Sequence, residues 1–359
     1  MSWILAFLGF AALILLHELG HFTAAKAVGM RVERFAVFFP PLLAKKTVGE
    51  TEYGIGAIPL GGYVRITGMN PNEEIPEDVL PRAYFKQPVW KRVVVISAGP
   101  LANVLVAFLI LWGLYWANGE PVESVKVGGV AKEYPAEGVL KPGDRIVSID
   151  GVTGGQAALA KQTATHRCAG RQTAGCRAST PAVVVVTRNG TRRVFRITPI
   201  YDAAKNVKRT RLGFSFAQES RPVGPIDAAG LSVSGMWGVT TGTVDAIARI
   251  VTPEGRKQIS GVVGSYEATR QSFELDLTRA LNILAIISLS LAIVNLFPFL
   301  PLDGGHIFWA VAEKVRGRPI PFAVMERASV VGFVLVLFLF FVGLTNDIDR
   351  LQGQGFGVR

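Results

Sequence analysis

The hydrophobic residues of this chain gather in four long runs instead of being spread evenly. A helix needs roughly 20 apolar residues to cross a bilayer. The runs without any charged residue cover 1–16, 93–119, 280–302 and 328–346. They predict four transmembrane helices, over residues 1–28, 93–118, 280–310 and 328–346. A cleavable signal peptide is disfavoured for the first run, because no Lys or Arg precedes Lys26.

Between the first two runs the pattern changes to one typical of strands. Residues 53–68 alternate apolar residues with glycine, and the pair Gly61-Gly62 suits a tight turn. We therefore expect a β-hairpin region within 29–92, followed by a solvated, proline-rich loop. Two interpretations stay open: a β element that dips into the membrane beside an active site, or an ordinary cytosolic hairpin.

A soluble α+β domain is predicted over residues 119–200. Two β-rich runs flank Asn189-Gly190, a strong hairpin signal. The chain's two cysteines, Cys168 and Cys176, lie in this domain, where a disulfide, free thiols or a metal clip are all open. Residues 201–279 are expected to connect to the third run, with another strand at "RLGFSF" and a flexible connection up to 240, and with helical spacing over 241–279. Residues 311–327 and 347–359 are expected to be a cytoplasmic loop and a tail.

The positive charge of the chain bears on its orientation in the membrane. The net charge is +11, from 38 Lys and Arg against 27 Asp and Glu. Short loops rich in Lys and Arg stay in the cytoplasm, and such loops follow the first run, precede the second and separate the last two. The N-terminus and the soluble domain should therefore be extracytoplasmic. We expect the lipid bilayer, and no nucleic acid, to be the surrounding partner.

The polar end of the first run carries candidate chemistry. In "HELGH", His17 and His21 are four residues apart, so on a helix both imidazoles face one ion. Glu18 can then address a water on that ion, an arrangement that suits zinc. The alternative is that each histidine is a core residue bonded to a backbone carbonyl. Ionisable groups at membrane depth are costly and usually functional, which favours the metal.

Zinc needs a third protein ligand, and the best candidate is in "NLFPFLPLDGGHIF". Asp303 ends the third apolar run, after Pro298 and Pro301, which should break the helix. The first and third runs should cross in the same direction, so Asp303 and His17 should end at similar depths. The alternative third ligand is His306.

Three motifs together resemble the site-2 protease family of intramembrane zinc metalloproteases. They are "HELGH", "AGPLANVL" and "NLFPFLPLDGGH", in order over nearly the whole chain. The resemblance is closest to bacterial members with an inserted PDZ domain. It implies that Zn2+ is the cofactor, with His17, His21 and Asp303 as ligands and Glu18 as the catalytic base.

The resemblance also assigns residues beyond the metal ligands. It implies a role near substrate for Asn295, and it places Gly99 and Asn103 on a family GxxxN motif. For both asparagines the alternative is hydrogen bonding between helices, which we favour for Asn103. A locally unwound substrate could add a strand to the β region, so Gly61, Gly62 and Tyr63 are candidate substrate-binding residues.

The stretch "VGGVAKEYPAEGVLKPGDRIVSIDGV" looks like a PDZ domain of this family. PDZ domains bind peptides by adding a strand to a sheet edge, although a domain that only blocks access is the alternative. Two features depart from the family pattern. One is the cysteine-containing loop at 153–181, and the other is "SGVVG" at 260–264, where many members carry Gly-Pro.

The resemblance implies an intramembrane zinc metalloprotease of the bacterial inner membrane. It also implies single-span membrane proteins as substrates, such as the anti-sigma factors or signal-peptide remnants usual for bacterial relatives, usually after a first extracytoplasmic cut. Two alternatives are a membrane-embedded zinc protease that cuts exposed loops, and a non-catalytic membrane-anchored PDZ adaptor.

Overall fold

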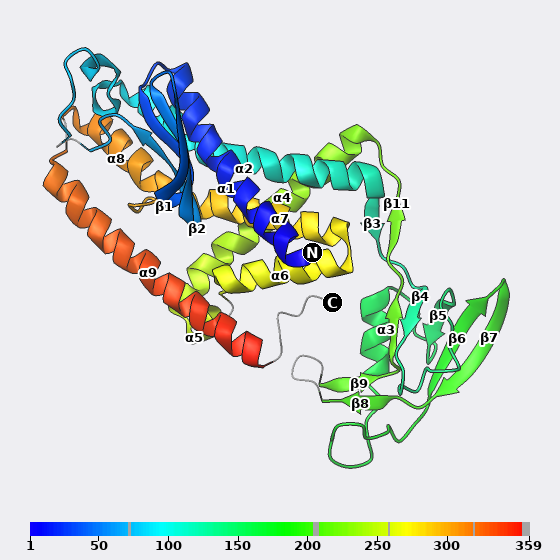
Figure 1. Ribbon diagram of the computed structural model, residues 1–359. Coiled ribbons are helices and arrows are strands. Elements are labelled where there is room, and N and C mark those ends of the chain that lie inside the picture. Colours follow the sequence, from blue (N-terminus) through cyan, green and yellow to red (C-terminus); the bar gives the residue numbers. More distant parts are fainter. Residues whose placement is uncertain (71–72, 204–207, 258, 319, 354–359) are drawn as a thin grey trace. The chain divides into compact units, whose positions relative to one another are not determined.

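The computed structural model describes residues 1–70, 73–203, 208–257, 259–318 and 320–353 (Figure 1). The chain divides into two compact units. We call Met1–Ala117 with Gly224–Arg359 the membrane unit, and Asn118–Val223 the insert unit.

Four helices of the membrane unit are long and apolar enough to cross a bilayer, as the sequence predicts. They fit a multi-pass membrane protein, because they expose large apolar side chains that water would not tolerate in such numbers. Helix α9 is longer than the expected 328–346 and takes in much of the expected tail, whose residues 354–359 lie outside the described part. The four helices are α1 (Ser2–Ala27), α2 (Val89–Asn118), α7 (Leu277–Asn295) and α9 (Phe322–Gln352).

The third membrane segment is two helices, which corrects the single span expected over 280–310. Helix α7 ends at Asn295, and α8 (Asp303–Arg316) begins after a proline-containing break. A side chain on Gly304 would place its Cβ 2.2 Å from the Leu296 carbonyl oxygen. The glycines that follow Asp303 therefore let α8 start directly against the backbone of the break.

The β region consists of β1 (Val32–Val48) and β2 (Thr51–Ile66), which pair antiparallel along 42–48 with 51–56 and along 32–37 with 62–66. Its turn lies at Gly49, whose φ is 62°, so the turn expected at Gly61-Gly62 is wrong and that pair lies inside β2. Residues 34–37 pair both with 52–55 and with 62–65. Residues 62–66 pair only with β1 among the described strands, so they form an edge of this small sheet.

The flexible connection expected up to residue 240 is wrong over most of helix α4 (Pro225–Ala248). The helical structure expected over 241–279 agrees with the end of α4 and with α5 (Pro253–Arg256) and α6 (Val262–Leu275). The "SGVVG" stretch forms the start of α6. There the buried Asp347 carboxylate of α9 accepts bonds from the N–H groups of Gly261 (3.1 Å) and Gly264 (2.7 Å), which caps the helix.

The insert unit is an α+β body that continues to Val223, beyond the boundary expected at residue 200. A three-stranded sheet of order β5-β6-β7 and the pair β4-β10 enclose an apolar core with α3. The hairpin at Asn189-Gly190 joins β6 to β7, as predicted. The elements are β3 (Glu120–Val122), β4 (Val127–Val130), β5 (Arg145–Ile149), α3 (Gln156–Thr163), β6 (Ala182–Arg188), β7 (Thr191–Ile197), β8 (Ile200–Asp202), β9 (Arg209–Arg211), β10 (Phe214–Phe216) and β11 (Glu219–Arg221).

The first and last strands of the insert unit are paired with each other. Glu120 of β3 faces Arg221 of β11, and their side chains form an ion pair of 2.6 Å. The chain thus enters and leaves this unit at adjacent positions. Of the alternatives for the two cysteines, the structure has the disulfide Cys168–Cys176.

The ion pair between Asp144 and Arg188 should stabilise the insert unit. Asp144 is 1% exposed, accepts two bonds from the guanidinium (2.6 and 2.7 Å) and one from the Lys141 N–H. We expect Asp144→Asn to lower the free energy of unfolding of this unit by about 3 kcal/mol, because it leaves a half-paired buried cation. Native-state hydrogen exchange of β5 and β6 measures this in the full chain.

The effect should depend on pH. The Arg188 guanidinium lowers the pKa of Asp144 below its ordinary value. The stabilisation is therefore complete above the unfolded pKa of about 3.9 and is lost as pH falls through the lower folded pKa. Arg192→Ala, on the exposed side of β7, is the matched control and should change stability by less than about 0.5 kcal/mol. Equal exchange rates in Asp144→Asn and wild type at pH 7 would contradict the assignment.

Candidate metal centre

Helix α1 places its two histidines on one buried face. His17 and His21 are each 7% exposed, and their rings lie edge to face with centroids 4.9 Å apart. Their Nε2 atoms are 3.3 Å apart. The four-residue spacing on a continuous helix therefore does what the sequence predicts, and brings two ligand atoms together.

Asp303, the first residue of α8, brings a carboxylate to the same point. Its Oδ2 lies 3.2 Å from His17 Nε2 and 3.4 Å from His21 Nε2. These three residues form the one group among the described residues whose His, Cys, Asp and Glu atoms are close enough to hold a metal ion. Asp303 Oδ2 is also buried without a well-formed hydrogen bond.

The spacing of the three atoms fits a tetrahedral metal ion. Zinc binds His nitrogen and carboxylate oxygen at about 2.0–2.1 Å, so two ligand atoms of a tetrahedron lie about 3.3–3.4 Å apart. The observed separations are 3.2, 3.3 and 3.4 Å. Hydrogen bonding alone explains this triangle poorly, because each neutral imidazole has a single N–H to share. The donor set of two imidazoles and one carboxylate leaves a fourth position open for a reactant.

Residues of helix α2 contact the Nδ1 atoms of both histidines. His21 Nδ1 lies 2.9 Å from the Val95 carbonyl oxygen, and His17 Nδ1 lies 3.2 Å from the side-chain nitrogen of Asn103. Gly99 lies between them, where an added Cβ would lie 2.2 Å from His21 Nε2. The side chain of Asn103 does bond between helices, as expected, but its partner is the candidate ligand His17 itself.

Glu18 lies beside the three candidate ligands and against the β sheet. Its carboxylate is within electrostatic range of His17, His21 and Asp303, and it makes no hydrogen bond or ion pair with the described residues. A Cβ on Gly62 would lie 2.8 Å from Glu18 Cγ. The sheet edge at 62–66 therefore packs directly on Glu18, which places the β element beside the candidate site.

The other predicted residues lie farther from the cluster or have other partners. Gly61 packs against the ring of Phe39, and the hydroxyl of Tyr63 accepts a bond from Arg34 (3.1 Å). Asn295 is the half-buried last residue of α7. His306, the alternative third ligand, lies one turn after Asp303 and is not part of the metal-holding group.

Charged pairs at the ends of the membrane helices hold the elements that carry the site. Glu50, at the β1–β2 turn, bonds both Arg82 and Lys26 at the end of α1, each at 2.7 Å. The bonds from Arg82 and Lys26 lower the pKa of Glu50 to about 2. Arg92 of α2 bonds Glu313 of α8 at 2.8 Å, which fixes the helix that begins with Asp303.

Two groups that support the site are not among the residues predicted from the sequence. Gly20 lets α1 and α2 approach, since a Cβ there would lie 2.4 Å from the Ala98 carbonyl oxygen. Its position inside "HELGH" was a usable signal. The hydrogen bond to the Val95 carbonyl could not be predicted, because every residue has a backbone carbonyl whatever its side chain.

Comparison with known proteins agrees with this geometry. A protein of Rhizobium meliloti (strain 1021) is 31% identical over 95% of this chain and 94% of its own length. Relatives from Nostoc sp. (strain PCC 7120) and Clostridium perfringens (strain 13) are both 30% identical, over 99% and 97% of this chain and 98% of their own lengths. All three bear the name "Putative zinc metalloprotease". The pattern that defines peptidase family M50 matches residues 5–339, so the chain belongs to that family, the site-2 protease family that its motifs resemble.

Proposed function

We propose that this protein is a zinc metalloprotease that hydrolyses peptide bonds within or near the transmembrane segment of single-span membrane proteins. The observation that carries the proposal is the triangle of His17, His21 and Asp303 ligand atoms, 3.2–3.4 Å on each side. Zinc is the cofactor that the donor set, the family and the names of the relatives support.

The chemistry follows from the groups around the triangle. Zinc, when bound by His17, His21 and Asp303, supplies a Lewis acid that polarises the scissile carbonyl and makes water more acidic. Glu18 takes a proton from the attacking water and delivers it to the leaving amine. A carboxylate without a hydrogen-bond partner in the described part of the chain suits this role, because no competing bond has to break.

The sheet edge at 62–66 suits the handling of substrate. A transmembrane helix hides its carbonyl groups in its own hydrogen bonds, so the segment to be cut must first unwind. An unwound strand can pair with the unpaired edge at 62–66, next to Glu18. This gives Gly61, Gly62 and Tyr63 a part in substrate binding, with Gly62 leaving room for close approach.

The two alternative functions are less well supported. A zinc protease acting on exposed loops commonly uses a glutamate as third ligand, whereas the residue in the cluster is Asp303. A non-catalytic adaptor would not require three ligand atoms close enough to bind one metal ion. It would also not require a Glu18 carboxylate that has no hydrogen bond with the described residues.

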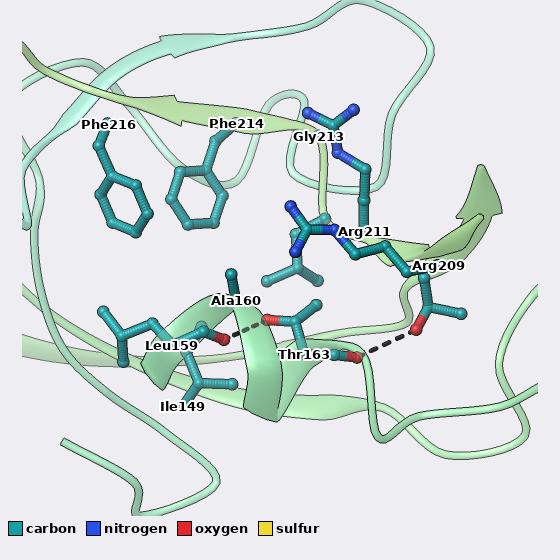
Figure 2. A pocket seen from close by; sticks show the side chains of 11 residues that line it. Ile149, Leu159, Ala160, Thr163, Arg209, Arg211, Gly213, Phe214 and Phe216 are labelled. Atoms are coloured by element: carbon teal, nitrogen blue, oxygen red, sulfur yellow. Dashed lines mark hydrogen bonds between the residues drawn. The ribbon is translucent and has the colours of Figure 1, made fainter. Parts of the chain in front are cut away.

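The insert unit has a groove that suits an extended peptide, consistent with the PDZ likeness of its sequence. The cavity of about 200 Å³ lies between α3 and the β9–β10 segment. Figure 2 shows Phe214 and Phe216 directed toward Leu159 and Ala160 of the helix. Arg209 and Arg211 also line it, which favours a peptide with a carboxylate end or an acidic residue.

The orientation in the membrane follows from the basic loops. We propose that the protein lies in the bacterial inner membrane, with the N-terminus and insert unit outside the cytoplasm. The natural substrate would be a single-span protein, such as an anti-sigma factor or a signal-peptide remnant, already trimmed by a first cut.

We expect Glu18→Gln to retain zinc and to lower cleavage of a single-span substrate by about 10²–10⁴-fold, the usual contribution of a general base. The change removes the base but leaves every ligand in place. Single-turnover cleavage and metal content of the purified protein are the measurements. Turnover within a few-fold of wild type would show that Glu18 is not the base.

Asp303→Ala should lose zinc affinity and cleavage together, since it removes one of three protein ligands. His306→Ala is the matched control and should keep both, because His306 is outside the metal-holding group. Chelator competition gives the affinities. The reverse pattern would make His306 the third ligand.

Removing the insert unit should leave zinc binding and peptide-bond hydrolysis intact and should change which substrates are cleaved. Because β3 and β11 are paired, residues 120–221 can be replaced by a short glycine linker without moving the flanking helices. We expect zinc binding and cleavage of a trimmed substrate to persist, and cleavage of the same substrate with a bulky outer domain to rise. Loss of trimmed-substrate cleavage in a folded, zinc-loaded variant would make the groove a required docking site instead of a gate.

A further inference from the structure

The two candidate histidine ligands need their proton on a defined ring nitrogen. A histidine that binds metal through Nε2 carries its proton on Nδ1 and must donate it to an acceptor. For His21 the acceptor is the Val95 carbonyl, 2.9 Å from Nδ1. A carbonyl oxygen can only accept, so α2 fixes His21 with its Nε2 lone pair directed to the ligand cluster.

For His17 the corresponding partner is the side-chain amide of Asn103. Its nitrogen lies 3.2 Å from His17 Nδ1, its residue is 0% exposed, and its Oδ1 is buried without a hydrogen bond. An amide nitrogen facing Nδ1 would require the His17 proton to be on Nε2, in the middle of the ligand cluster. That placement is incompatible with metal binding.

Rotating the amide by half a turn resolves the conflict. An amide nitrogen and oxygen occupy almost the same volume, and the surrounding hydrogen bonds decide which is which. With Oδ1 toward His17, the oxygen gains a donor and the Nε2 lone pair is free for the metal.

We infer that Asn103 is a positioning residue that accepts the Nδ1 proton of His17 and so holds that imidazole in its metal-binding form. The inference rests on the proposed zinc function and adds a residue outside the ligand set. It also explains why α2 carries an asparagine here, four residues after the Gly99 that makes room for His21.

The test is zinc affinity of the purified full chain, measured by chelator competition, with Co2+ absorption as a second readout. Asn103→Leu keeps the side chain's size but has no acceptor, whereas Asn103→Asp has acceptors only. Outer hydrogen bonds of this type contribute about 10–100-fold to metal affinity. We expect Asn103→Leu to bind zinc about 10–100-fold more weakly, with an altered cobalt spectrum, and Asn103→Asp to stay within about threefold of wild type.

Ser288→Ala is the matched control, because it removes a buried bond to the same residue without touching His17. It should bind zinc like wild type. Wild-type affinity in Asn103→Leu would overturn the inference, and so would an affinity in Asn103→Asp as low as in Asn103→Leu. If Asn103→Leu does not fold, Asn103→Asp decides alone, since a carboxylate cannot donate to Nδ1. Failure of the proposed function looks different: wild type would then bind no zinc, and His17→Ala would change nothing.

Discussion

The close contact between α1 and α2 is the constraint on which the rest of the site depends. Cβ atoms on Gly20 and Gly99 would lie 2.4 Å and 2.2 Å from atoms of the opposite helix. Without those side chains the helices approach until the histidine rings of α1 touch the backbone of α2. The rings are then fixed by Val95 and Asn103, and their Nε2 atoms meet the carboxylate that α8 supplies.

This arrangement answers the problem of keeping polar groups within an apolar unit. Two imidazoles and two carboxylates at membrane depth are costly unless they share a partner. A divalent cation at the triangle would bind three of these groups directly. The fourth, Glu18, would lie beside the ion as the proposed base. The break between α7 and α8 contributes as well, because an apolar helix ends there and an amphipathic helix begins at Asp303, the candidate ligand. Under the proposed function, the sheet edge next to Glu18 would offer the backbone pairing that an unwound substrate lacks.

The sequence predicted those features that depend on residue type and spacing. Helical spacing brought His17 and His21 together, and uninterrupted apolar runs located the four membrane helices. Features that depend on long-range packing were missed. Gly61-Gly62 looked like a turn, but these glycines lie within a strand, where Gly62 has no Cβ because Glu18 is there. The sequence predicts no helix for the part of α4 before residue 241, because its glycines, serines and threonines have low intrinsic helix propensity, which packing on α7 overrides. The role of Asn103 was equally hidden, since an interhelical asparagine says nothing of its partner.

Zinc K-edge X-ray absorption of the purified full chain shows whether His17, His21 and Asp303 bind zinc together. We expect one zinc per chain in a first shell of nitrogen and oxygen only, at about 2.0–2.1 Å, with imidazole scattering from two rings that falls to one in His21→Ala. A chain that carries no zinc, or a shell that contains sulfur or keeps both imidazoles after His21→Ala, would contradict it.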